Sequence, residues 1–138
     1  MMNSYKTNLN LLNVDIGLLI FRIAIAGLML THGFPKLLTL FGPDEIKFAD
    51  PLGLGETVSF TLTVFAEFIC SAFIIFGFLT RFSAIPIIIT MAVAAFIVHV
   101  PDGFGKQELP LLFMFGFLLL AICGGGKYSL DYLLQNRK

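Results

Sequence analysis

Residues 57–79, TVSFTLTVFAEFICSAFIIFGFL, and residues 82–100, FSAIPIIITMAVAAFIVHV, decide the fold of this chain. Each segment is close to the roughly 20 mostly apolar residues that a membrane-spanning helix needs. Only Thr80 and Arg81 separate the two segments. The stretch therefore predicts two spanning helices that form a tight antiparallel hairpin.

Two further apolar segments lie outside this hairpin, at about residues 14–34 and 109–124. Together the four segments predict an all-α transmembrane four-helix bundle that forms a single domain over residues 1–138. Residues 37–56 mix apolar side chains with acids, Pro and Gly, which predicts an interfacial loop with a short helix near residues 44–49. Residues 127–138 are predicted to form an interfacial C-terminal segment, in which Ser129 caps a short helix at 130–135.

The composition agrees with a membrane protein. Charged residues make up 13% of the 138 residues and hydrophobic residues 57%, whereas about a quarter of the residues in a soluble domain are charged. The lipid bilayer is therefore the expected partner. The formal net charge is zero and no basic block occurs, so nucleic acid is not an expected partner. Cys70 and Cys123 lie far apart without a C-x-x-C motif, and their role stays open.

The distribution of Lys and Arg predicts the orientation in the membrane. With both termini inside, the inner side would hold Lys6, Arg81, Lys127, Arg137 and Lys138, and the outer side Lys36, Lys47 and Lys106. This bias predicts a multi-pass protein of the cytoplasmic (inner) membrane with cytoplasmic N- and C-termini.

Two charged residues interrupt the apolar segments, Arg22 in the first and Glu67 in the second. A charge in the middle of the bilayer costs roughly 2.5–3.5 kcal/mol on insertion scales. Counted from the expected helix ends, the two residues lie at similar depths, so a buried Arg22–Glu67 ion pair is predicted. Such a pair could serve only to fix helix register, or Glu67 could also belong to a proton or ligand site.

A second polar group is predicted at the outer end of the bundle, where His32, Lys36, His99 and Glu108 would converge beside Lys106. Pro35 is expected to end the first span and to aim Lys36. Imidazole and ammonium groups can bind a carbonyl oxygen or an anion, so the pocket would suit a quinone head group or a small oxyanion. No H-x-x-x-H spacing occurs, and a metal site is not predicted.

Several motifs resemble those of the DoxX family of small membrane proteins. They are Arg22 in the first span, Gly33-Phe34-Pro35-Lys36 at its end, Glu67 followed by Gly77-Phe78-Leu79-Thr80-Arg81, and Gly124-Gly125-Gly126-Lys127-Tyr128-Ser129-Leu130-Asp131. The resemblance implies a four-helix membrane bundle associated with respiratory or sulfur redox chemistry. The family takes its name from a subunit of a terminal quinol oxidase with thiosulfate:quinone oxidoreductase activity.

The sequence thus favours a quinone-interacting or accessory subunit of a membrane redox system, with a redox partner subunit or a second copy of itself as partner. No cofactor motif is evident, and quinone is the candidate ligand. Whether the chain is itself an enzyme, an oxidoreductase subunit by resemblance, stays open. The alternatives are a non-catalytic scaffold that docks a partner subunit and a small proton-coupled transporter that uses Glu67 as its protonatable group.

Overall fold

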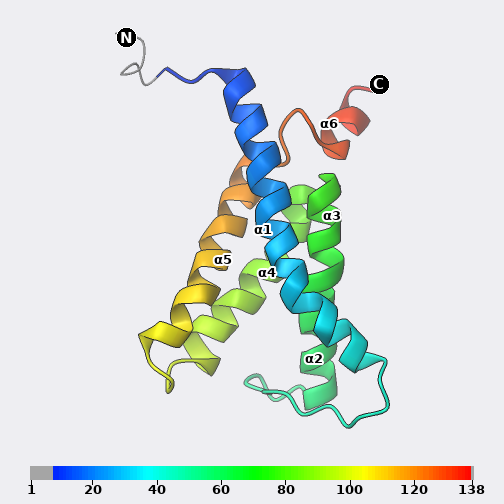
Figure 1. The fold of residues 1–138 in the computed structure, drawn as a ribbon, viewed down its shortest axis with the longest axis vertical. Helices are drawn as coiled ribbons and strands as arrows, with labels where there is room; N and C mark the ends of the chain where they lie inside the picture. Colours follow the sequence, from blue (N-terminus) through cyan, green and yellow to red (C-terminus); the bar gives the residue numbers. More distant parts are fainter. Residues whose placement is uncertain (1–7, 138) are drawn as a thin grey trace.

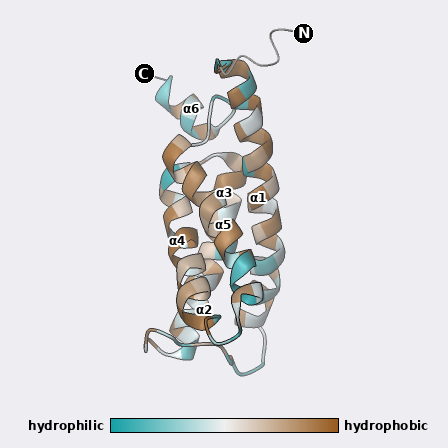
Figure 2. Ribbon diagram, turned by 90° about the vertical axis from the view of Figure 1, so that its left-hand side faces the viewer, coloured by the Kyte–Doolittle hydropathy of each residue, from teal (hydrophilic) through white to brown (hydrophobic). Residues whose placement is uncertain are grey.

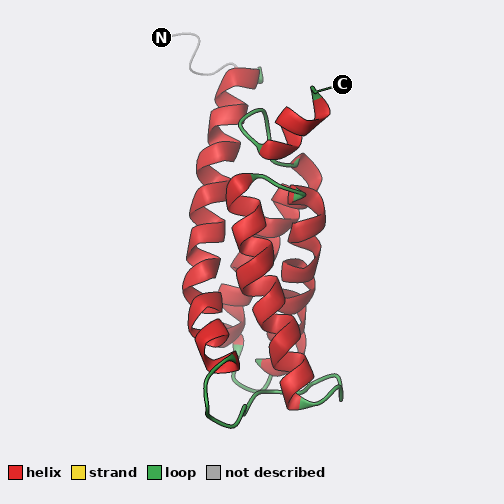
Figure 3. Cartoon of the chain, turned by 90° about the vertical axis from the view of Figure 1, so that its right-hand side faces the viewer, coloured by secondary structure: helices red, strands yellow, loops and turns green. Residues whose placement is uncertain are grey.

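The computed structural model describes residues 8–137, which form helices joined by loops (Figure 3). The first span is α1 (Leu11–Leu40). The second contains α2 (Glu56–Val64), the π-helical segment η2 (Phe65–Cys70) and α3 (Ser71–Phe76). The third contains α4 (Thr80–Val93) and the π-helical segment η3 (Ala94–Val98). The fourth is α5 (Phe104–Cys123), and the short helix α6 (Leu130–Gln135) follows it.

Four of these helical stretches are long and apolar enough to cross a membrane: Leu11–Leu40, Glu56–Phe76, Thr80–Val98 and Phe104–Cys123. These helices are largely hydrophobic along their length (Figure 2). Many large apolar side chains point outward, as lipid contact requires, among them Ile20, Leu28, Leu112 and Phe115. The predicted all-α bundle of four spans is confirmed.

The core lies where all four spans pack, and small side chains set its spacing. Ala26 of α1, Ala66 of η2 and Ala84 of α4 are all fully or almost fully buried. Small residues at helix contacts let the backbones approach closely in membrane proteins. Phe117 of α5 and Ile87 of α4 are fully buried between them and fill the centre.

Helix α1 differs from the predicted first span because it continues through Pro35 to Leu40. A proline removes one backbone N–H donor and crowds the preceding turn, yet the helix continues unbroken to Leu40. The Thr39 hydroxyl donates to the Pro35 carbonyl at 3.1 Å, within this added part of the helix. The prediction that the span ends near Pro35 is therefore wrong.

The loop between α1 and α2, which we call the covering segment (residues 41–55), is also different from the prediction. No helix forms at residues 44–49. The carboxylate of Asp50 organises this loop, since it accepts hydrogen bonds from the Ser59 hydroxyl and from the amides of Leu54 and Gly55. Donation by Ser59, and then by Gly55, holds the pKa of Asp50 below its ordinary value.

The hairpin between the second and third spans turns at residues 77–79, slightly earlier than the predicted Thr80-Arg81 link. Gly77 adopts the left-handed conformation with φ 69°, which glycine accepts without steric cost. Thr80 and Arg81 already belong to α4. The Asp131 carboxylate accepts from the amides of Leu79 and Thr80 at 2.7 and 2.9 Å, and so caps the start of α4.

The C-terminal segment closes the end of the bundle at which α1 begins (Figure 1). Ser129 caps α6 as predicted, because its hydroxyl accepts from the Tyr132 amide. The segment is also fastened to the spans. Arg22 donates to the carbonyls of Gly125 and Tyr128, and Asp15 accepts from the Lys127 amide. The segment predicted to rest at the interface is thus tied into the bundle.

Candidate functional site

An ion pair between Lys36 and Glu67 forms the centre of the candidate site. Lys36 Nζ lies 2.6 Å from Glu67 Oε2, and the side chains are 30% and 4% exposed. Glu67 belongs to the π-helical segment η2. Such segments are rare, and they occur frequently at functional sites. Here a π-helical segment holds a nearly buried carboxylate that is paired with a partly exposed ammonium group. This pair is therefore a candidate site for binding a polar ligand.

Gly33 explains why the two charged side chains meet. A Cβ atom at Gly33 would lie 2.6 Å from both the carbonyl carbon and the carbonyl oxygen of Glu67, and 2.9 Å from the Phe68 nitrogen. Only glycine therefore lets α1 approach the backbone of η2 this closely. Lys36 follows Gly33 by three residues and lies on nearly the same face of α1. The close approach therefore brings its ammonium group to the Glu67 carboxylate.

The structure overturns the predicted Arg22–Glu67 ion pair. Arg22 is 2% exposed and donates to the Gly125 and Tyr128 carbonyls at 2.6 and 2.9 Å. Eleven residues separate Arg22 from Gly33, which contacts Glu67, and this corresponds to about 16 Å along a helix. The predicted depths failed because α1 extends to Leu40, so that Arg22 lies about 27 Å from that end of the helix. Glu67 lies only about 16 Å from the start of α2, at the same end of the bundle.

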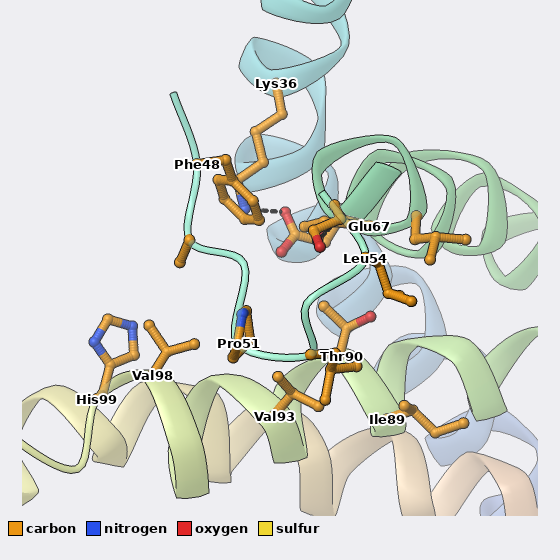
Figure 4. A pocket seen from close by; sticks show the side chains of 15 residues that line it. Lys36, Phe48, Pro51, Leu54, Glu67, Ile89, Thr90, Val93, Val98 and His99 are labelled. Atoms are coloured by element: carbon orange, nitrogen blue, oxygen red, sulfur yellow. Dashed lines mark hydrogen bonds and ion pairs between the residues drawn. The ribbon is translucent and has the colours of Figure 1, made fainter. Parts of the chain in front are cut away.

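The first of two cavities beside the ion pair, which we call the apolar cavity, has a volume of about 310 Å³. Figure 4 shows it between the covering segment, with Phe48, Pro51 and Leu54, and the third span. Lys36 and Glu67 are its charged groups. Its walls are mostly apolar, and they include Ile89, Val93 and Val98. The cavity therefore suits a molecule with a polar head and an apolar body.

The second cavity, which we call the polar cavity, has a volume of about 430 Å³. Lys36, Glu67 and His99 line both cavities, and His32 and Lys106 line only the polar one. The ion pair thus lies beside both cavities, one mainly apolar and the other lined by basic side chains together with apolar ones such as Met29 and Phe113.

Three of the four residues predicted to form a polar pocket do line the polar cavity, namely His32, Lys36 and His99. The fourth, Glu108, is exposed and lines neither cavity. Helix α5 begins at Phe104, earlier than the predicted span, and the face that it turns to the cavity carries Lys106, Leu109, Pro110 and Phe113. Glu108 falls outside this helical phase.

The contacts of the two histidines differ. The His32 ring packs edge-on against Phe113, with ring centroids 5.6 Å apart. His99 Nδ1 lies 3.0 Å from Asp102 Oδ2. Sequence reasoning missed Gln107, which donates to the Ala95 carbonyl at 2.7 Å. That bond ties the start of α5 to the π-helical segment η3, just before His99.

The described residues contain no group of three or more His, Cys, Asp and Glu side chains that could hold a metal ion. Cys70 is buried and Cys123 is exposed, and both are free thiols. The polar side chains around the two cavities include Lys36, Glu67 and the two histidines. The Lys36 ammonium donates hydrogen bonds, the Glu67 carboxylate accepts them, and a histidine ring can do either.

Comparisons with known proteins agree with this architecture. Residues 17–100 match the family described as DoxX. A protein of Escherichia coli (strain K12) named "Inner membrane protein YqjF" is 33% identical over 129 residues, which cover 89% of this chain and 95% of that protein. An uncharacterized protein of Haemophilus influenzae is 31% identical over 127 residues, which cover 87% of this chain and 84% of that protein. No solved structure matches significantly. The chain belongs to the DoxX family, as a small integral membrane protein with four apolar helices.

Proposed function

We propose that this protein binds the head group of a membrane quinone in the apolar cavity and serves a membrane redox system as a quinone-interacting or accessory subunit. The observation that carries the proposal is the Lys36–Glu67 ion pair in a cavity whose walls are otherwise mostly apolar. A quinone has the matching pattern, since its ring carries two carbonyl oxygens and an apolar tail.

The hydrogen-bonding capacity of the ion pair suits both redox states of such a ligand. The Lys36 ammonium has three N–H donors and uses one of them on Glu67 Oε2. A further donor is free for a quinone carbonyl. The Glu67 carboxylate keeps Oε1 available to accept from a quinol hydroxyl. Electron transfer itself is assigned to a partner redox subunit in this proposal.

The position of the cavity also suits a ligand that arrives from the bilayer. Leu62 of α2 and Ile89 of α4 line the apolar cavity and are 53% and 56% exposed. An isoprenoid tail could lie between them and continue into the lipid. The volume of about 310 Å³ is at the lower end of the range for ligand pockets, roughly 300–1,000 Å³, as expected if only the head group is enclosed.

The polar cavity would then exchange protons between the ion pair and water. His99, beside Asp102, lines both cavities. An imidazole at this position can pass a proton from one side to the other. We therefore expect His99→Ala to affect ligand binding less than a change at Lys36, because its main role would be proton exchange.

Titration of the purified protein with a short-chain quinone, in which calorimetry measures the heat of binding, tests the proposal. Lys36→Met is expected to weaken binding about tenfold or more, because a hydrogen bond from a charged donor is lost. Lys47→Met is the matched control, since Lys47 is exposed in the covering segment and lines neither cavity. If quinone does not bind at all, or if both variants bind it equally, the proposal is refuted.

Localisation forms part of the same proposal. We place the protein in the inner membrane, which is the location that the name of its Escherichia coli relative gives for that protein. The start of α1 and helix α6 lie at one end of the bundle (Figure 1), and we assign that end to the cytoplasm because of the Lys and Arg distribution. Fusion of a reporter that is active only in the cytoplasm to the C-terminus would test this orientation.

A further inference from the structure

A third cavity lies at the opposite end of the bundle from the ion pair, beside α6. Its volume is about 400 Å³, and it is lined by the start of α4, the end of α5 with its glycine-rich turn, and α6. It shares no lining residue with the apolar or the polar cavity. It is therefore a separate cavity from the two beside the ion pair.

The cavity is lined by one cation, Arg81, and one carboxylate, Asp131. Arg81 lies across the turn, since a Cβ atom at Gly124 would be 3.1 Å from Arg81 Nε and 3.5 Å from Nη2. Among the described residues, no carboxylate forms an ion pair with Arg81. Asp131 also lines the cavity, but each of its oxygens already accepts a backbone amide at the start of α4. The guanidinium group is thus left to pair with an anion.

A buried hydroxyl in the same wall also lacks a partner. Thr80 lines the cavity and is 0% exposed, and its Oγ1 has no hydrogen-bond partner among the described residues. Buried polar atoms almost always have one, because leaving them unpaired is costly. Thr80 is adjacent to Arg81 in the chain. Both residues line the cavity, so both groups are candidates to donate to the oxygen atoms of one ligand.

The apolar surroundings indicate what kind of anion this is. Leu79 and Phe82 line the cavity and are 45% and 72% exposed. On α6, Leu133 and Leu134 are 59% and 51% exposed. A free phosphate ion would not contact these apolar surfaces favourably, whereas acyl chains would cover them. We propose that this cavity binds the head group of an anionic phospholipid, with its phosphate at Arg81 and Thr80 and its chains along Leu79 and Phe82.

This assignment follows general lipid chemistry. A guanidinium group binds phosphate oxygens through two parallel N–H donors, and basic pockets between membrane helices bind anionic head groups. The end of the bundle that carries the cavity would lie at the membrane surface, where phosphate groups are abundant. The bound lipid would also brace the glycine-rich turn, whose Gly125 carbonyl accepts from Arg22.

Lipid retention tests the proposal. The full chain would be purified in mild detergent, incubated with phosphatidylglycerol or phosphatidylcholine, and analysed by native mass spectrometry. We expect phosphatidylglycerol to be retained preferentially. Arg81→Gln should lower its retention about tenfold, and Arg81→Lys should lower it less. Lys127→Gln is the matched control, because Lys127 is an exposed cation at the same end of the bundle that does not line the cavity. This variant should retain phosphatidylglycerol to within about twofold of the unmodified protein.

The remaining arms separate the sources of the anion and the effects of folding. Equal retention of the two lipids, or equal losses in Arg81→Gln and Lys127→Gln, would overturn the proposal. If inorganic phosphate binds and phosphatidylglycerol does not displace it, the occupant is a free phosphate and the lipid assignment is wrong. Thr80→Val keeps the side-chain shape but removes the hydroxyl, so it should lower retention without lowering thermal stability. This variant supplies the test if Arg81→Gln does not fold.

Discussion

Replacing Gly33 with alanine is expected to destabilise the bundle, although alanine is the better helix former. The added Cβ atom would lie 2.6 Å from the carbonyl carbon and oxygen of Glu67, well below the 3.4 Å at which ordinary contact begins. All three of the nearest atoms belong to the backbone of η2. They cannot rotate away as the end of a side chain could, so α1 must move outward.

The size of the effect follows from two opposing contributions. Alanine gains about 1 kcal/mol over glycine inside a helix. Overpacking a close contact costs typically about 1–3 kcal/mol, and a clash with backbone belongs at the upper end of that range. We therefore expect Gly33→Ala to lose about 1–2 kcal/mol of unfolding free energy. The outward shift of α1 would also lengthen the Lys36–Glu67 contact and weaken ligand binding.

Gly27 provides a matched control in the same helix. A Cβ atom there would have no neighbour within 4 Å, so Gly27→Ala should stabilise the protein by about 0.5–1 kcal/mol. Reversible unfolding in mixed detergent micelles, followed by circular dichroism, would measure both variants. If Gly33→Ala is as stable as Gly27→Ala, then α1 does not approach η2 as the structure indicates, and the explanation of the ion pair fails.

Three further predictions concern charged groups. A double-mutant cycle of unfolding free energies between Lys36→Met and Glu67→Gln should show a coupling of about 1 kcal/mol or more. A cycle between Arg22→Gln and Glu67→Gln should show almost no coupling. The reverse pattern would mean that Glu67 pairs with Arg22, as predicted from the sequence. Asp131→Ala should cost about 1–2 kcal/mol of unfolding free energy, because the start of α4 loses its cap; an unchanged denaturation midpoint would contradict this. The pKa of Asp50 is lowered in the folded protein, so its contribution to the order of the covering segment is complete above the unfolded-state pKa of about 3.9 and is lost as the pH falls through the folded-state pKa. Proteolysis of that segment by an acid-active protease should therefore rise at the lowest pH, and Asp50→Asn should remove this pH dependence.

Much of the architecture could be predicted from local pattern. The bilayer requires long apolar helices, so run length and composition identify four spans without knowledge of their packing. The cap at Ser129 was equally local, because a hydroxyl before a short helix binds an amide only three residues away. Helix ends were less certain, as α1 shows by continuing through Pro35. A proline weakens a helix at one point, and contacts elsewhere decide whether the helix resumes.

The candidate site was predictable only in part. Topology brings His32, Lys36 and His99 to one end of the bundle, and the structure places all three around the polar cavity. The rotation of α5 could not be derived from topology, and it turns Glu108 away. Glu67 pairs with Lys36 rather than with Arg22 because of an axial offset between two antiparallel helices. Counting residues from estimated helix ends does not resolve that offset.

The sequence by itself determined that this protein is a membrane bundle of four apolar helices, and that Arg22 and Glu67 each need a polar partner inside it. Only the tertiary structure decided which partners these are. The cost of a buried charge depends on its surroundings, and those come from segments far apart in the chain. Gly33 allows α1 close enough to η2 for Lys36 to reach Glu67, while the C-terminal turn supplies Arg22 with the carbonyls of Gly125 and Tyr128.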